Sequence, residues 1–242
     1  MLRAKVDAIN SVDGHMDDGV DCAVCRNRGY LAVVDGDAVR TVDCRCMTQR
    51  RARRRLAKSG LADSIRRCTF DAYQTPELWQ AKAKAMAKRY VSEREGWFVV
   101  SGASGSGKTH LCTAICGELL RQNVNTRYLQ WRSDTPELKA LVNTDEYAKA
   151  MYGYRNAHCL YIDDFWKGAL TDADLKLTFD ILNSRYNDET KLTVISTELP
   201  IERILEVDEA IGSRIYERSR GRYISITGDN KNWRLRRITE DN

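Results

Sequence analysis

Proline and long apolar runs are scarce in this chain. It has only three prolines among 242 residues, with 43% hydrophobic and 30% charged residues, which is typical of a folded globular protein rather than a disordered one. No apolar run approaches the roughly 18 to 20 residues of a membrane-spanning helix. The first residues, MLRAKVDAINSVDGH, lack the apolar core of a signal peptide. We therefore expect a cytoplasmic protein that does not bind membranes.

A strong excess of one charge is also missing, because the net charge is only +5. Such a balance permits an anionic partner such as nucleic acid without requiring one. The length suits one domain of about 150 residues and a smaller module. We predict an N-terminal module at residues 1–60, a linker and entry helix at 61–95, and a main domain at 96–242.

A glycine-rich loop is present between a short apolar run, Phe98–Val100, and a helical segment that starts near Thr109. The loop fits G-x-x-x-x-G-K-T, the phosphate-binding loop, in its usual strand–loop–helix context. Its residues, together with the histidine that follows, are Gly102, Ala103, Ser104, Gly105, Ser106, Gly107, Lys108, Thr109 and His110. Backbone N–H groups of such a loop converge on phosphate oxygens. We predict that these residues bind ATP, that Lys108 reaches the β- and γ-phosphates, and that Thr109 ligates Mg²⁺.

A second apolar run, Cys159–Ile162, ends in Asp163 and Asp164. A buried parallel strand that ends in two acids places them at the carboxyl edge of the sheet, where ligands of α/β folds bind. We predict that Asp163 holds Mg²⁺ through water and that Asp164 orients or deprotonates the attacking water. The alternative is a pair of turn or helix-capping aspartates.

Further strands and helices complete an α/β pattern. Strands are expected at Thr126–Trp131, Lys191–Thr197 and Tyr223–Thr227, and helices at Pro76–Glu95 and Asp172–Asp188. Strands that alternate with helices predict a parallel sheet flanked by helices. The polar end of the strand LTVISTEL places Thr197 or Glu198 where it could sense the γ-phosphate; a polar residue that merely closes the strand is the alternative.

The N-terminal segment carries Cys22 and Cys25 in a C-x-x-C pattern, then Cys44 and Cys46 in a C-x-C pattern. Four thiolates at this spacing suit a tetrahedral Zn²⁺ site that supplies folding free energy to a small module. The residues between them predict a hairpin with strands at Tyr30–Val34 and Ala38–Val42. Redox-active cysteines are the alternative.

Several motifs together resemble a known family. They are Cys68-Thr69-Phe70, SGASGSGKTHL, LYIDDF with Lys167 just after it, NSRYND, DEAIGSRIYER and the terminal NWRLR. Between about Cys68 and Ile238 the chain resembles replicative helicase loaders of the DnaC/DnaI type, which are AAA+ ATPases related to the IstB-like transposition helpers.

The resemblance implies roles for two arginines and for the N-terminal module. Arg214 matches an arginine finger that acts on ATP held by a neighbouring subunit, and Arg234, beside Trp233, matches an arginine that senses nucleotide in its own subunit. Family members often carry Asn where this chain has Thr197 and Glu198. The N-terminal module would contact a hexameric helicase, and the basic segment that begins at Arg50 would contact DNA or an acidic helicase surface, or simply face solvent.

The expected function is therefore an ATPase that loads a replicative helicase onto single-stranded DNA and self-associates through Arg214. Its cofactors would be ATP, Mg²⁺ and Zn²⁺. A transposition helper keeps the same fold with another partner. A small-molecule kinase and a zinc-dependent adaptor without ATPase activity are the remaining alternatives.

Overall fold

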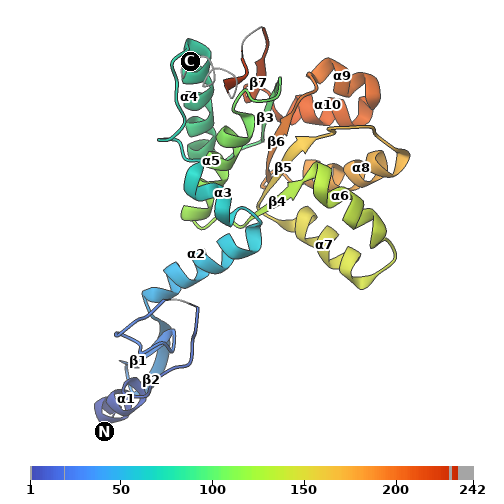
Figure 1. Cartoon of the computed structure of the whole chain (residues 1–242). Coiled ribbons are helices and arrows are strands. Elements are labelled where there is room, and N and C mark those ends of the chain that lie inside the picture. Colours follow the sequence, from blue (N-terminus) through green and yellow to red (C-terminus); the bar gives the residue numbers. More distant parts are fainter. Residues whose placement is uncertain (1, 19, 229–230, 234–242) are drawn as a thin grey trace. The chain divides into compact units, whose positions relative to one another are not determined.

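The computed structural model describes residues 2–18, 20–228 and 231–233, except for the side chains of residues 52, 53, 55, 56, 58 and 59. The chain divides into two compact units, Met1–Arg55 and Leu56–Asn242 (Figure 1). None of the described helices is long and apolar enough to cross a membrane.

The N-terminal unit is built around a two-stranded hairpin. Its elements are α1 (Leu2–Asn10), β1 (Tyr30–Asp35), β2 (Ala38–Asp43) and α2 (Cys46–Ser59), of which α2 continues into the second unit. The strands pair antiparallel from Tyr30 opposite Asp43 to Asp35 opposite Ala38, which confirms the predicted hairpin. Gly36 occupies the turn with φ +60°, a conformation that glycine adopts without steric cost.

The second unit is an α/β fold with a five-stranded sheet, as the sequence predicts. The strands are β3 (Trp97–Gly102), β4 (Thr126–Gln130), β5 (Cys159–Phe165), β6 (Leu192–Thr197) and β7 (Tyr223–Ile226). They lie in the order β4-β5-β6-β3-β7, and every neighbouring pair is parallel. All five strands therefore end at the same edge of the sheet, and the segments that follow β3, β5 and β6 meet there.

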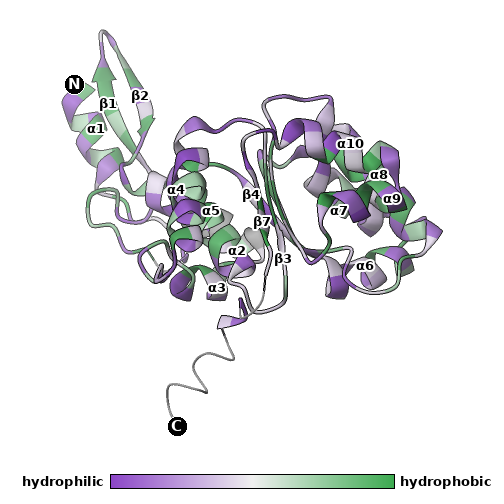
Figure 2. Cartoon of the chain, turned by 90° about the horizontal axis from the view of Figure 1, so that it is seen from above, coloured by the Kyte–Doolittle hydropathy of each residue, from purple (hydrophilic) through white to green (hydrophobic). Residues whose placement is uncertain are grey.

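Helices cover both faces of this sheet. Their bounds are α3 (Ala62–Arg67), α4 (Leu78–Glu93), α5 (Lys108–Arg121), α6 (Trp131–Ala140), α7 (Asp145–Asn156), α8 (Asp172–Tyr186), α9 (Ile201–Val207) and α10 (Glu209–Arg218). Figure 2 shows α4 and α5 on one side of the sheet and α6 to α10 on the other. Successive residues of β3 point to opposite faces of the sheet. Phe98 and Val100 pack toward α5, and Trp97 and Val99 pack into the hydrophobic cluster on the other face.

The predicted element bounds differ from the structure by a few residues. The entry helix α4 ends at Glu93, where Arg94 adopts a left-handed conformation with φ +53°. Trp131, expected at the end of β4, begins α6 instead. The helical pair α6 and α7 between β4 and β5 was not predicted.

Arg185, in the NSRYND motif, stabilises the far end of the sheet. It is fully buried, and its guanidinium donates to the carbonyls of Ala157 (2.8 Å) and Tyr154 (2.9 Å) and to the Thr193 hydroxyl (3.1 Å). Burial lowers the pKa of Arg185 to about 10, so it remains charged at neutral pH. Its role is to satisfy backbone carbonyls where β5 and β6 begin.

Candidate functional site

The glycine-rich loop leads from β3 directly into α5. Gly105 and Gly107 have φ values of +77° and +87°, so the loop uses backbone conformations that side chains disfavour. The helix begins at Lys108, whose Nζ donates to the carbonyl oxygens of Gly102 (2.8 Å) and Ala103 (2.9 Å). Burial lowers the pKa of Lys108. The ammonium group of Lys108 therefore lies inside the loop, bound to two backbone carbonyls. Phosphate oxygens of a nucleotide could replace these carbonyls.

Asp163 and Thr109, the two predicted Mg²⁺ ligands, are in contact. The Thr109 hydroxyl donates to Asp163 Oδ1 over 3.1 Å, although 54 residues separate them in sequence. Asp163 is only 4% exposed. Its carboxylate also accepts hydrogen bonds from Tyr128 (3.0 Å) and from Ser196. A carboxylate and a hydroxyl oxygen beside a phosphate loop are the donors that Mg²⁺ prefers, so these residues fit the ion.

Asp164 follows Asp163 within β5, where the pairing with β6 shifts register, and it has a strained φ of +53°. Its backbone N–H donates to Asp163 Oδ1 and to Ser196 Oγ, both over 3.1 Å. Its side chain is partly exposed and pairs with Lys167 over 3.4 Å. The two acids therefore differ in environment: Asp163 is enclosed by donors, whereas the Asp164 carboxylate remains accessible to water.

At the end of β6, Ser196 contacts the site, whereas the predicted Thr197 does not. Thr197 is fully buried, and its hydroxyl donates to the Phe165 carbonyl over 2.9 Å. Ser196, which contacts Asp163, was missed by sequence reasoning, and so was Tyr128 on β4. Glu198 remains the candidate sensor, because its carboxylate pairs over 2.9 Å with Lys167, which also pairs with Asp164.

A cavity of about 310 Å³ lies beside the loop. It is lined by Arg67, Ala72, Tyr73, Gln74, Gln80, Ser106, Gly107, His110 and Trp233. The His110 ring nitrogen bonds the Thr69 carbonyl at 2.9 Å, and the ring packs edge-on against Tyr73. Trp233 donates its backbone N–H to the Gly105 carbonyl over 2.9 Å. This cavity, with aromatic and polar walls next to the loop, is suited to a nucleobase.

Arg214 projects from α10 onto α8. Its guanidinium lies over the rings of Phe179 (5.2 Å) and Tyr186 (5.3 Å), and it donates to the Ala210 carbonyl over 2.7 Å. Among the described residues, no contact joins Arg214 to the phosphate loop of its own chain. Arg234, the second predicted arginine, lies outside the described residues.

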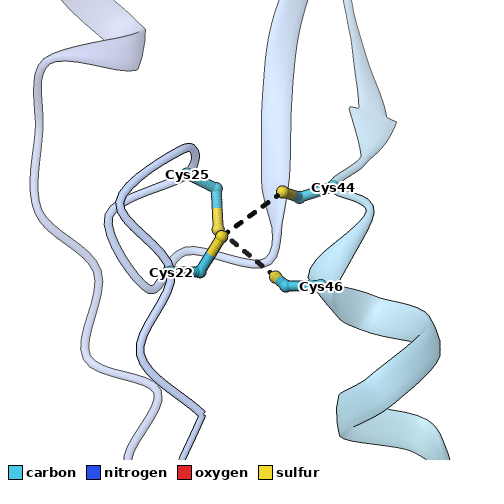
Figure 3. A group of neighbouring side chains, drawn as sticks. All are labelled: Cys22, Cys25, Cys44 and Cys46. Atoms are coloured by element: carbon cyan, nitrogen blue, oxygen red, sulfur yellow. Dashed lines mark hydrogen bonds between the residues drawn. The ribbon is translucent and has the colours of Figure 1, made fainter.

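The four N-terminal cysteines meet in the first unit. Figure 3 shows Cys22 and Cys25 on one loop, facing Cys44 after β2 and Cys46 at the start of α2. The Sγ atoms of Cys22 and Cys44 are 3.8 Å apart and those of Cys25 and Cys46 are 3.5 Å apart; all four lie within 4.8 Å of one another. Zn–S bonds of about 2.3 Å in a tetrahedron place sulfurs about 3.8 Å apart, so the cluster fits Zn²⁺.

Charge supports the same interpretation of the cluster. Burial raises the pKa of Cys44 and that of Cys46, the latter to about 12, whereas backbone hydrogen bonds lower the pKa of Cys22 to about 7. A bound divalent cation would favour the thiolate form of all four cysteines. The fully buried Arg50 lies one helical turn after Cys46 on α2 and donates to the carbonyl of Val20 and the side chain of Asn27, both over 2.6 Å. Arg50 thus stabilises the loop around the cysteine cluster. The basic segment that begins with it can offer DNA or protein only its later residues.

The chain has the features that define a P-loop nucleotide-binding protein: a phosphate loop, a pair of acids and a parallel sheet. Residues 27–239 match the family model of the IstB-like ATP binding protein, so the chain belongs to that family. It is 33% identical over 227 residues to the phage-like element PBSX protein XkdC of Bacillus subtilis (strain 168), covering 86% of this chain and 83% of that protein. It is also 39% identical over 66 residues to the replicative helicase loader DnaC of Escherichia coli (strain K12), covering 26% of this chain and 27% of DnaC.

Two solved structures share the fold. The crystal structure of DnaI superposes with a TM-score of 0.57 at 23% identity, covering 69% of this chain and 92% of that one. The crystal structure of the DnaC helicase loader gives a TM-score of 0.54 at 22% identity, covering 68% and 99%. The resemblance found in the sequence motifs is thereby confirmed at the level of family and fold.

Proposed function

We propose that this protein is an ATPase that loads a replicative hexameric DNA helicase onto single-stranded DNA. The observation that best supports ATPase activity is the contact between Thr109 and Asp163, which lies beside the ammonium group of Lys108 in the phosphate loop. The loader part is supported by the similarity to DnaC in sequence and to DnaC and DnaI in fold.

The geometry of the site supports the following residue roles. Loop amides from Gly102 to Thr109 bind the phosphates, and Lys108 leaves its carbonyl partners to contact the β- and γ-phosphates. Thr109 and Asp163 hold Mg²⁺. Asp164, which is open to solvent, orients the attacking water and accepts its proton.

The partners belong to the same proposal. The N-terminal unit, with Zn²⁺ held by Cys22, Cys25, Cys44 and Cys46, docks on the helicase. Arg214, which has no contact with its own loop in the described structure, completes the site of a neighbouring copy. ATP binding and hydrolysis then change the affinity of the assembly for helicase or DNA, as in a nucleotide-driven switch.

A loading assay tests this proposal. Circular single-stranded DNA is incubated with the host's replicative helicase and this protein, and the helicase that remains on DNA after a salt wash is measured. We expect retention to require both the protein and ATP, and to be lost in Lys108→Ala. Helicase retention that is equal with and without the protein would contradict the loader role.

A transposition helper with the same ATPase site is the alternative function of a chain in the IstB-like family. Affinity capture on the intact protein separates the two partners. We expect the replicative helicase to be retained in the presence of ATP and a transposase not to be. The reverse result would assign the helper function.

A further inference from the structure

Lys167 lies two residues after β5 and contacts two carboxylates. Its Nζ is 3.4 Å from Asp164 Oδ2 and 2.9 Å from Glu198 Oε1. The three side chains are between 28% and 33% exposed, so they are neither sealed in the core nor freely solvated. The hydrogen bond between Lys167 and Glu198 raises the pKa of Lys167 and lowers that of Glu198. Both residues are therefore charged at neutral pH.

The backbone fixes Lys167 in this position. The pairing of β5 with β6 shifts register between Ile162 and Phe165, and Trp166 has a φ of +57°. The Lys167 N–H donates to the Asp164 carbonyl over 3.0 Å, and the buried Trp166 ring stacks on Phe165. The lysine thus extends from a tight, anchored turn and not from a loose loop.

Glu198 links this turn to the phosphate loop. Burial lowers the pKa of Lys108, whose ammonium lies in the loop, and the negative charge of Glu198 acts against this effect. A triphosphate bound in the loop would bring additional negative charge close to Glu198 and Lys167. In a partly enclosed site, charges at such distances interact much more strongly than they do in bulk water.

We propose that Lys167 and Glu198 form a pair that distinguishes ATP from ADP, an inference that rests on the proposed nucleotide binding. The γ-phosphate repels Glu198 and attracts Lys167, so Lys167 exchanges its contact with Asp164 for one with phosphate. The Asp164 carboxylate is thereby released to orient water. ADP has no γ-phosphate and leaves the ion pairs of Lys167 in place.

The competing explanation is an ordinary ion pair that holds the turn after β5. Partly exposed pairs of that kind contribute little to folding stability. Such a pair would not respond to the number of phosphates on the nucleotide. The ratio of the dissociation constants for ATP and ADP therefore separates the two explanations, whereas a melting temperature does not.

The test measures binding of labelled ATP and ADP, with Mg²⁺, to the full chain and its variants. Lys167→Met leaves two uncompensated carboxylates beside the γ-phosphate, so we expect the Kd for ATP to rise about tenfold and that for ADP less than about twofold. Glu198→Gln removes the repulsion, so the Kd for ATP should fall about threefold. In the double variant the two effects should largely cancel, and Lys167→Arg should behave like the wild type.

Lys191→Met is the matched control, because Lys191 also pairs with an aspartate three residues before it, Asp188, at 3.3 Å. It should leave both dissociation constants unchanged. Equal shifts for ATP and ADP in Lys167→Met would overturn the sensing role while wild-type binding remains. Absence of saturable ATP binding by the wild type would instead overturn the proposed function itself.

Discussion

At the scale of single residues, the two acids of the LYIDD strand have separable tasks. The buried Asp163 accepts hydrogen bonds from Thr109, Ser196 and Tyr128, whereas Asp164 is partly open to solvent. We expect Asp163→Asn to weaken Mg²⁺-dependent ATP binding about tenfold and Asp164→Asn to leave binding within about twofold. Hydrolysis should fall at least about 100-fold in Asp164→Asn, because a general base contributes about 10²- to 10⁴-fold. Nucleotide titration and phosphate release measure the two quantities.

Asp180→Asn serves as the control for this pair. Asp180 lies on α8 and pairs with Arg155, and its side chain is exposed. Binding and turnover should both match the wild type. Turnover in Asp164→Asn at the wild-type rate would remove the assignment of Asp164 as the base.

The motif residues and their chemistry were predictable, because an eight-residue loop and a paired acid strand define one arrangement at the sheet edge. Ser196 could also have been found: Leu192, Val194 and Ser196 alternate onto the face that carries Asp163, whereas Thr197 points the other way. Arg50 could not have been found. It begins a run of similar arginines, and only the folded path of the preceding loop decides which one contacts Val20 and Asn27.

At the scale of elements, the more deeply a helix or strand is buried, the better the sequence predicts it. The strands β3, β5 and β6 are buried along almost their whole length, so their apolar runs are unambiguous. In contrast, α7 buries only Met151 and α1 buries none of its residues, so neither sequence contains a continuous apolar run that would mark a buried element. Such helices depend on capping and tertiary contacts that composition does not reveal.

The N-terminus of α8 illustrates such capping. Thr171 and Asp174 form a reciprocal capping box, and Lys139 pairs with Asp174 over 2.9 Å. Burial acts to raise the pKa of Asp174, but the hydrogen bonds from Thr171 and Lys139 outweigh it, and the pKa is lowered. The charged carboxylate therefore stabilises the fold above its unfolded pKa of about 4, and this stabilisation is lost as the pH falls through the lower folded value.

We accordingly expect Asp174→Ala to reduce the free energy of unfolding by about 1 to 2 kcal/mol at pH 7. The difference from the wild type should shrink below about pH 4, where the wild-type carboxylate also becomes protonated. Denaturant unfolding at several pH values measures it. Asp172→Ala, in the same first turn but exposed, should cost less than about 0.5 kcal/mol. A difference that stays constant down to pH 3 would mean that the charge of Asp174 is irrelevant.

The N-terminal unit depends on its metal for a different reason. Its buried apolar cluster consists of Val20 and the four cysteines, with Leu31 packed against it. So small a core does not fold unaided, and Zn²⁺ bound to four thiolates can supply the missing free energy. We expect one zinc per chain and, after chelation, loss of protease resistance in residues 1–55 alone. Cys25→Ser should reproduce this result, whereas Cys68→Ser, in the second unit, should not. Full resistance of the metal-free unit would contradict the zinc role.

At the scale of the whole molecule, the proposed function requires that one chain supply only part of the catalytic site. The phosphate loop and the acids lie at the carboxyl edge of the sheet, but Arg214 packs on Phe179 and Tyr186 of α8. A guanidinium held on aromatic rings at a partly exposed surface is available to another copy of the chain. A head-to-tail contact would then join the loop of one copy to Arg214 of the next.

Mixing two inactive variants tests this arrangement. Lys108→Ala lacks a working loop but keeps Arg214, and Arg214→Ala keeps the loop but lacks the finger, so each alone should show little ATPase activity. In an equimolar mixture about a quarter of the loop–finger junctions are intact if copies associate at random, so the rate should recover to about a quarter of the wild-type value. Lys108→Ala mixed with Arg218→Ala, a change on the same helix, should give roughly half the wild-type rate, because every Arg214 is then intact. A mixture of the first two variants that stays at the sum of its inactive components would show that Arg214 does not act across the contact.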